Sequence, residues 1–297
     1  MNAIEQLRRE VVTDLHKLST LKKVWPTWLD SIQDTFQNQS PTNKTIRSLG
    51  NSLYDIFSGT SDGSRSQNEV AGGGAAWESL VCWYLNLCLI GSRTVVIKAK
   101  KAHIPESIFH AISVNYGNFK SNTESDLLAI TFPKDSTLEE SVQLKKADLL
   151  NLLEEAVHSQ FHETELTVIQ CKTNWNDNAQ IPMLWDLIYS SKGFSSEATV
   201  GSHGYSHTQL KKFAYAFVTV PTVKPDKIKN TSTCVKRVQN LSGGNFWGLP
   251  SKTGVAMNVA DILDKNFKTA LSEYKKGWNY EIEEKIAALN EQNYFQL

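Results

Sequence analysis

The chain has 297 residues, of which 40% are hydrophobic and 21% charged, a composition that can bury a sizeable core. The 31 basic and 31 acidic side chains cancel, which excludes a uniformly basic nucleic-acid coat but allows a local basic patch. No apolar run is long enough to span a membrane, and the amino-terminal residues lack the apolar block of a signal peptide. The four cysteines show no C-x-x-C spacing, so we expect a cytoplasmic protein with reduced thiols.

The first seventy residues are predicted to form a helical region followed by a polar loop. Apolar residues at helical spacing predict a helix over 3–37 that Pro26 interrupts, a loop over 38–45 and a short helix over 46–57. The polar Gly/Ser segment 58–69 follows, and we expect either a mobile loop or a segment that a partner such as DNA orders.

Short β-branched runs alternate with helical segments in the centre of the chain. The patterns predict helices over 75–90, 138–160 and 177–190, and strands over 94–98, 108–115, 127–132, 166–172 and 213–220. A helical tail over about 257–292 ends the chain. Interleaved helices and buried strands favour an α/β fold, divided into regions 1–70, 71–240 and 241–297 that pack as one compact domain.

Charge is distributed unevenly along the sequence. The stretch 211–237 contains seven basic residues and one acidic residue, whereas 139–165 contains seven acidic and two basic residues. These stretches predict a surface with separate basic and acidic faces, although two ordinary solvated faces explain the charge equally simply.

The strand over 166–172 ends in a lysine where apolar residues would be expected to continue. A charged residue that ends a buried strand needs a partner or a function, and the two-residue period places Gln170 and Lys172 on the same face. Asp126 precedes a second apolar strand, and Glu78 lies among the apolar residues of a helix. If the two strands pair, these groups could hold Mg²⁺ through Asp126, Gln170 and Glu78 while Lys172 orients or deprotonates a bound water.

The order helix-Glu, strand-Asp and strand-Gln-x-Lys resembles the PD-(D/E)XK nuclease superfamily, and within it the type II restriction endonucleases, over about 75–220. The resemblance assigns Glu78 to the auxiliary acid, Asp126 to the central acid and Gln170 and Lys172 to the E-x-K element, with Gln170 in place of the usual acid. It implies a central mixed β-sheet flanked by helices with helical additions at both ends. It also implies Mg²⁺-dependent, sequence-specific hydrolysis of double-stranded DNA by a homodimer.

A nuclease needs a surface that holds a duplex. Basic side chains give affinity through phosphates, and polar loops read base edges. The candidate DNA contacts are Arg65, Gln67, Asn68, Ser202, His203, Tyr205, His207, Lys211 and Lys212. A second basic cluster of Arg93, Lys98, Lys100 and Lys101 could also contact phosphates.

Other interpretations of the same residues stay open. Lys172 could pair with Glu165 or Asp177 in an ordinary ion pair, and Glu154, His158 and His162 could hold zinc on one helix face. The chain could also be a structure-specific repair or junction-resolving nuclease, or a DNA-binding module without catalysis.

Overall fold

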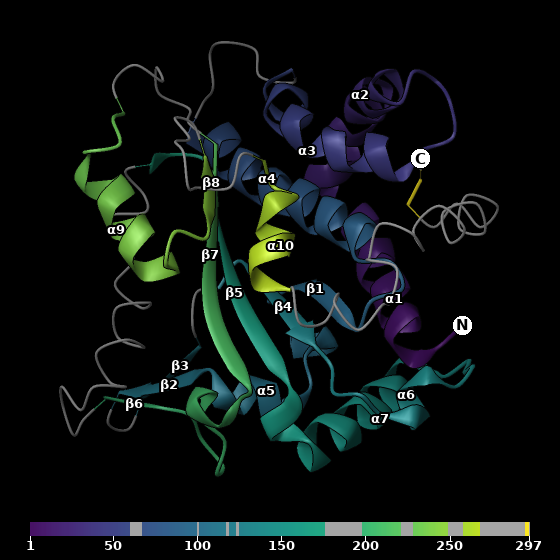
Figure 1. Cartoon of the computed structure of the whole chain (residues 1–297), viewed down its shortest axis with the longest axis vertical. Coiled ribbons are helices and arrows are strands. Elements are labelled where there is room, and N and C mark those ends of the chain that lie inside the picture. Colours follow the sequence, from purple (N-terminus) through teal and green to yellow (C-terminus); the bar gives the residue numbers. More distant parts are fainter. Residues whose placement is uncertain are drawn as a thin grey trace.

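A computed structural model describes residues 1–59, 67–99, 101–116, 119–122, 125–175, 198–220, 228–248, 258–267 and 295–296. The predictions of a helix over 177–190, of a helical tail beyond residue 267 and of an order–disorder change in 60–66 lie outside these residues. The α/β class is confirmed, because helices surround a mixed β-sheet (Figure 1).

The central sheet has five strands in the order β1-β4-β5-β7-β8. They are β1 (Thr94–Lys98), β4 (Leu127–Thr131), β5 (Glu165–Lys172), β7 (Lys212–Thr219) and β8 (Phe246–Gly248). The first three pair antiparallel, and β5, β7 and β8 pair parallel. The sequence predicted four of these strands, while β8 is too short for its three residues to show a period of two.

Four helices lie together on one side of the sheet (Figure 1). They are α1 (Ala3–Lys17), α2 (Ser19–Thr35), α3 (Asn43–Ser58) and α4 (Gln67–Cys88). The half of α4 from Ala76 onward is buried on nearly every side, because it packs on strands as well as on the other helices.

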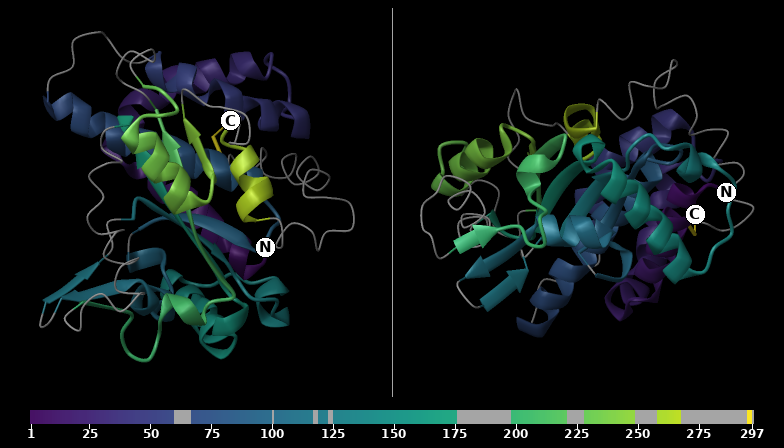
Figure 2. Two further views of the ribbon diagram at one scale, coloured as in Figure 1. Left: turned by 60° about the vertical axis from the view of Figure 1, so that its left-hand side comes forward. Right: turned by 90° about the horizontal axis from the view of Figure 1, so that it is seen from below.

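A smaller antiparallel sheet in the order β3-β2-β6 lies at the lower left of Figure 1, away from α2 and α3. Its strands are β2 (Ser113–Tyr116), β3 (Phe119–Asn122) and β6 (Ala198–Val200). Short helices complete the structure, and Figure 2 shows them from two further sides. They are η1 (Lys101–His103), α5 (Glu106–Ala111), α6 (Ser136–Glu139), α7 (Lys146–Ser159), η2 (Phe161–Glu163), η4 (His207–Gln209), α9 (Thr233–Ser242) and α10 (Asp261–Asn266).

The prediction that the first helix breaks at Pro26 is wrong. The break is at Leu18, whose extended backbone (ψ 129°) separates α1 from α2, and Pro26 lies inside α2. A proline removes one backbone hydrogen bond from a helix. The helix continues because the buried side chains of Leu21, Trp25 and Trp28 hold its apolar face against the core.

The predicted strand over 108–115 is instead the end of α5 followed by β2. A tertiary contact explains the difference: the Glu154 carboxylate on α7 accepts hydrogen bonds from the backbone N–H (3.0 Å) and hydroxyl (2.9 Å) of Ser107. A carboxylate at the first turn stabilises a helix that the local sequence does not reveal. The predicted helix over 138–160 is likewise two helices, α6 and α7, joined by a segment without helix.

Buried side chains form one core cluster that extends from Ala3 to Phe295. Arg8 is fully buried and ties α1 to the start of β1, donating hydrogen bonds to the carbonyl oxygens of Thr94 (2.8 Å) and Ser92 (3.0 Å). The four cysteines are free and buried. Among the described residues, every helix is too short or too polar to cross a lipid bilayer.

Candidate active site

One carboxylate oxygen at the start of β4 accepts three hydrogen bonds from the end of β5. Oδ2 of Asp126 accepts from Nε2 of Gln170 (2.6 Å), from the backbone N–H of Cys171 (2.8 Å) and from Nζ of Lys172 (3.3 Å). The sequence grouped Asp126, Gln170 and Lys172 on the condition that their strands pair, and the structure brings these three residues together.

Strand register explains this convergence. The antiparallel pair β4–β5 places Leu127 opposite Ile169, so that residues just before β4 face residues just after Ile169. A shift of one residue would turn Gln170 and Lys172 to the other face of the sheet. The buried apolar residues of both strands therefore fix the polar contacts at their ends.

The Asp126 carboxylate is largely shielded from solvent, and this burial changes its pKa. Burial raises the pKa of the Asp126 carboxyl to about 6, because desolvation opposes the charged form. The Lys172 ammonium opposes the rise, and the nearby negative charge of Glu78 adds to it. Lys172 forms its ion pair with Asp126 and not with Glu165, and Asp177, the other predicted alternative, lies outside the described residues.

Oxygen atoms that could bind a hard cation lie beside this network. Gln170 is 2% exposed, and its Oε1 atom is buried without a hydrogen-bond partner among the described residues. The Oδ1 atom of Asp126 also accepts no hydrogen bond in that part of the chain. Mg²⁺ prefers such carboxylate and amide oxygens, so Asp126 and Gln170 fit a magnesium site. The described residues contain no group of three His, Cys, Asp or Glu side chains placed to bind a metal.

Glu78 lies in the middle of α4 and not in the first turn of a helix, because α4 begins at Gln67 and not at the predicted residue 75. A stabilising role at the helix amino terminus therefore does not explain it. Its Oε2 atom forms an ion pair with Nζ of Lys98 (2.9 Å), and its side chain is 23% exposed. Glu78 is close enough to raise the pKa of Asp126, but its direct partner is a lysine.

Sequence analysis predicted that Lys98 contacts phosphates, and it did not place Lys98 near Asp126 and Glu78. Lys98 ends β1, and β1 pairs with β4 so that Lys98 lies opposite Leu127, next to Asp126. The available signal was that TVVIK, like LTVIQCK, is an apolar strand that ends in a lysine.

The predicted DNA contacts on the loop between β6 and β7 lie at the opposite end of the sheet. The parallel pair β5–β7 places Lys212 beside Glu165 and Thr219 beside Lys172. Seven residues of strand separate these two ends by about 23 Å. The structure therefore does not bring Ser202, His203, Tyr205, His207, Lys211 and Lys212 next to Asp126. Arg65 and the side chains of Gln67 and Asn68 lie outside the described part of the chain.

Within that loop, hydroxyl and imidazole groups bind one another. The Ser202 hydroxyl lies 2.9 Å from both Nδ1 of His110 and the hydroxyl of Ser113. The Tyr205 hydroxyl hydrogen-bonds Nδ1 of His158. The loop has left-handed backbone at Gly201 (φ 97°), His203 (φ 53°) and Gly204 (φ 84°). These contacts tie the loop to α5 and α7, although a hydroxyl beside an imidazole is also an arrangement of hydrolytic enzymes.

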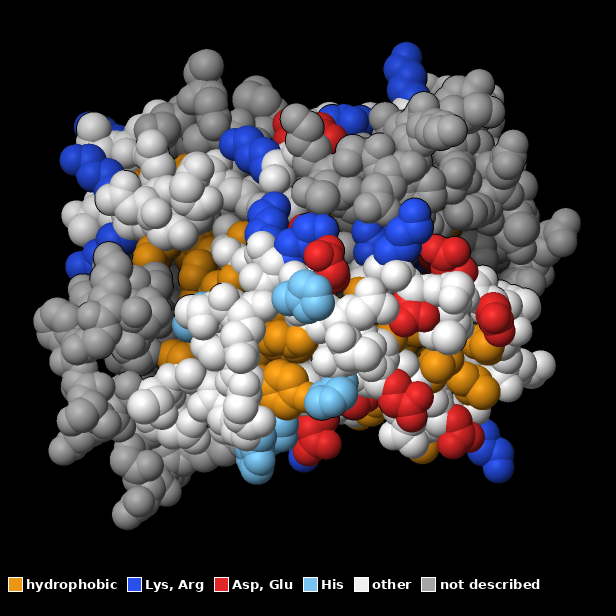
Figure 3. All heavy atoms as spheres, turned by 60° about the horizontal axis from the view of Figure 1, so that its bottom comes forward, with side chains coloured by type: hydrophobic (Ala, Val, Ile, Leu, Met, Phe, Trp, Pro, Cys, Tyr) orange, Lys and Arg blue, Asp and Glu red, His pale blue; other side chains and the backbone are white. Residues whose placement is uncertain are grey.

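Lys211 and Lys212 both have partners in the structure. Nζ of Lys211 forms an exposed ion pair with Glu163 (2.8 Å), and Nζ of Lys212 donates to the backbone carbonyl of Asn266 (2.6 Å). The basic and acidic stretches of the sequence therefore meet at Lys211 and Glu163 and are not fully separate faces. Figure 3 shows basic side chains across the upper middle of one face, with most of the acidic ones below and to the right of them.

The predicted zinc set Glu154, His158 and His162 does not form a metal group among the described residues. Glu154 binds Ser107, and His158 binds Tyr205, while His162 lies beyond the end of α7 in η2. The helix ends before the third residue of the pattern, which breaks the four-residue spacing that the prediction needed.

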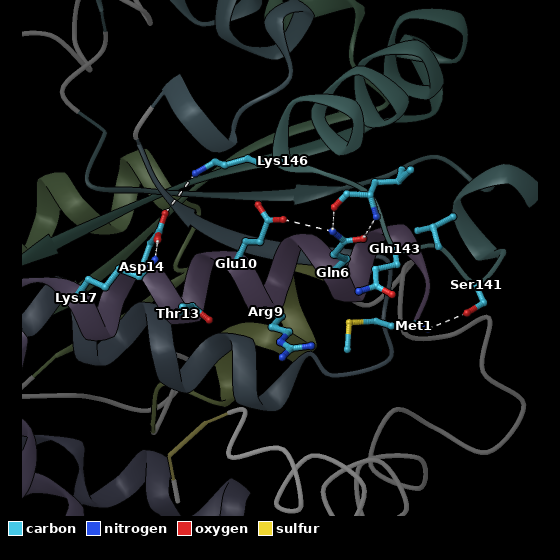
Figure 4. Close-up of a pocket in the computed structure, with 12 residues that line it drawn as sticks. Met1, Gln6, Arg9, Glu10, Thr13, Asp14, Lys17, Ser141, Gln143 and Lys146 are labelled. Atoms are coloured by element: carbon cyan, nitrogen blue, oxygen red, sulfur yellow. Dashed lines mark hydrogen bonds and ion pairs between the residues drawn. The ribbon is translucent and has the colours of Figure 1, made fainter.

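A groove of about 730 Å³ runs along α1 and contains none of the predicted site residues. Figure 4 shows Asp14 and Lys146 facing each other across it and Gln6 pointing toward the chain near Gln143. Its lining mixes charged and polar groups without a convergent set of unpartnered ligands, so we assign it no function.

Comparisons with models of protein families, with curated proteins and with solved structures found no match. The geometry of the site is therefore what indicates a function.

Proposed function

We propose that the chain is a Mg²⁺-dependent endonuclease that hydrolyses phosphodiester bonds of double-stranded DNA at specific sequences, as type II restriction endonucleases do. The observation that carries this proposal is the convergence of Gln170, Cys171 and Lys172 on one oxygen of Asp126. The strand-Asp and strand-Gln-x-Lys parts of the sequence pattern are thus joined by contacts between residues far apart in the chain, while Glu78 pairs with Lys98.

Asp126, Gln170 and Lys172 would have different roles in the hydrolysis. Asp126 and Gln170 would hold Mg²⁺, which, when bound, neutralises phosphate charge and lowers the pKa of a bound water. The Lys172 ammonium, 25% exposed and 3.3 Å from Asp126, is placed to orient the attacking water or to stabilise negative charge as it develops on the phosphate. The hydrogen bonds from Gln170 and Cys171 keep the Asp126 carboxylate in one orientation.

Digestion of a mixed-sequence plasmid with Mg²⁺ tests the proposal, with EDTA as the blank. We expect discrete bands, and sequencing of the ends should give one short recognition site. Smearing or cutting only at junctions would instead indicate a structure-specific nuclease, and the absence of all cutting would leave a DNA-binding module.

The Lys172→Ala variant tests the assigned residue. It should lose cleavage while it keeps its affinity for DNA in Ca²⁺, because the alanine removes the ammonium but leaves Asp126 and Gln170. Lys134→Ala, at an exposed lysine away from these contacts, is the matched control and should cut normally. Normal cutting by Lys172→Ala would refute the assignment.

A homodimer belongs to the same proposal, because one active site cuts one strand and a two-fold axis matches a palindromic duplex. Among the described residues Met1 is the one large hydrophobic side chain that is exposed, and others, such as Leu152 and Leu241, are partly buried. Light scattering with and without cognate DNA in Ca²⁺ should show two chains per duplex.

A further inference from the structure

The ion pair between Glu78 and Lys98 places a fixed positive charge beside the candidate active site. Nζ of Lys98 lies 2.9 Å from Oε2 of Glu78 and 3.4 Å from both the carbonyl oxygen of Ala75 and the hydroxyl of Ser79. The Lys98 side chain is 15% exposed, so the pair lies between α4 and β1 and not on the open surface. A pair in this position is screened less by salt than a surface pair.

Lys98 also lies next to the strand that carries Asp126. It pairs with Leu127 in the β1–β4 ladder, and the backbone N–H of Ala99 donates to the carbonyl oxygen of Asp126 (3.3 Å). The ammonium of Lys98 is therefore fixed by its strand on one side and by three oxygen atoms of α4 on the other. This geometry leaves Glu78 with a cationic partner before any metal binds.

The charges of the site balance without a metal ion. Asp126 and Glu78 carry two negative charges, Lys172 and Lys98 carry two positive charges, and Gln170 adds none where the E-x-K pattern would place an acid. Two divalent cations in a cluster of zero net charge would repel each other without carboxylates to offset them.

On the basis of the proposed function, we propose that Lys98 takes the place of a second divalent cation beside Glu78, so that each chain binds one divalent metal ion, at Asp126 and Gln170. Lys98 is then a positioning residue. It keeps the Glu78 carboxylate from coordinating a metal ion, and it supplies a positive charge that, unlike a bound metal ion, cannot dissociate. Its removal should open a second metal site on Glu78.

Counting Mn²⁺ ions bound to the full-length chain without DNA tests this inference. Electron paramagnetic resonance measures free Mn²⁺, and the uptake of the Asp126→Ala, Glu78→Ala double variant is subtracted as surface binding. We expect one ion per wild-type chain and two per Lys98→Met chain. Lys98→Arg, which keeps the charge, and Lys134→Met, at an exposed lysine, should each bind one.

A further variant protects the test against simple misfolding. Glu78→Gln in the Lys98→Met background should return the count to one, which a disordered site would not do. Cleavage should follow the same change, with a Hill coefficient for Mg²⁺ near one in the wild type and near two in Lys98→Met.

The outcomes separate the two proposals. Two ions in the wild type, or an unchanged count in Lys98→Met, overturns the role of Lys98 while the nuclease assignment stands. A wild-type count equal to that of the double variant, with no cutting in Mg²⁺, overturns both.

Discussion

The two ends of β5 hold polar side chains in different ways. At its carboxyl end, Asp126 and Glu78 face Lys172 and Lys98 within a partly buried cluster of charges beside an unpartnered amide oxygen. At its amino end, hydroxyl and imidazole groups hydrogen-bond one another around the loop after β6, and Lys211 and Glu163 pair in solvent. Burying charge costs stability, so the first arrangement is the one that we propose to be functional, while the second is sufficient to fix a loop.

The largest expected difference between the two ends is in cleavage. Asp126→Ala should reduce the cleavage rate at saturating DNA by at least roughly 10³-fold, because a lost metal ligand is worth several kcal/mol of transition-state stabilisation. Ser202→Ala should lower the rate less than tenfold when DNA is below saturation, and saturating DNA should restore it. Single-turnover cleavage of cognate duplex measures both. Equal losses in the two variants would contradict the assignment of the chemistry to the carboxyl end of β5.

The second difference is in stability without metal. The raised pKa of Asp126 means that the folded chain holds a proton more tightly than the unfolded chain between about pH 4 and 6. Stability is therefore lost as the pH rises through this window, by up to about 3 kcal/mol. Asp126→Asn should be more stable than the wild type at pH 8 in EDTA, and the gain should vanish near pH 4. Urea unfolding at the two pH values measures it, and a loss of stability at pH 8 would contradict the prediction.

The loop at the amino end should be sensitive to backbone geometry and not to charge. Gly201 has φ 97°, and a Cβ atom there would lie 2.2 Å from the carbonyl oxygen of Tyr205. Gly201→Ala should cost about 1–3 kcal/mol of stability. Gly204→Ala is the matched control, since φ is 84° but the space is open, and it should cost about 1 kcal/mol. Thermal unfolding compares them, and equal costs would mean that the close contact does not matter.

The smallest effect concerns Lys211, whose exposed ion pair should add little to stability. If its end of the sheet contacts a phosphate, Lys211→Met should lower the salt dependence of DNA binding by about one unit of slope while the melting temperature stays the same. Titrations in Ca²⁺ at several salt concentrations measure the slope. An unchanged slope would remove Lys211 from the DNA interface.

Much of the site could be predicted from the sequence, because strand period and residue type are local properties. The two-residue period placed Gln170 and Lys172 on one face, and the apolar run after Asp126 marked its strand. The pairing of these strands was only a condition of the argument, since residues 132–164 lie between them. The Glu78–Lys98 pair was not predicted, because it depends on how α4 packs on β1.

The amino-acid sequence by itself determined the α/β class, four strands of the central sheet and the kinds of side chain available for chemistry, since these follow from local periodicity and composition. Tertiary structure alone decided that β4 and β5 are neighbours in the register that joins Asp126 to Lys172, that Glu154 starts a helix where a strand was expected, and that the polar loop after β6 lies about 23 Å away. The physical reason is that each of these depends on contacts between residues far apart in the chain, whose energies no local pattern records.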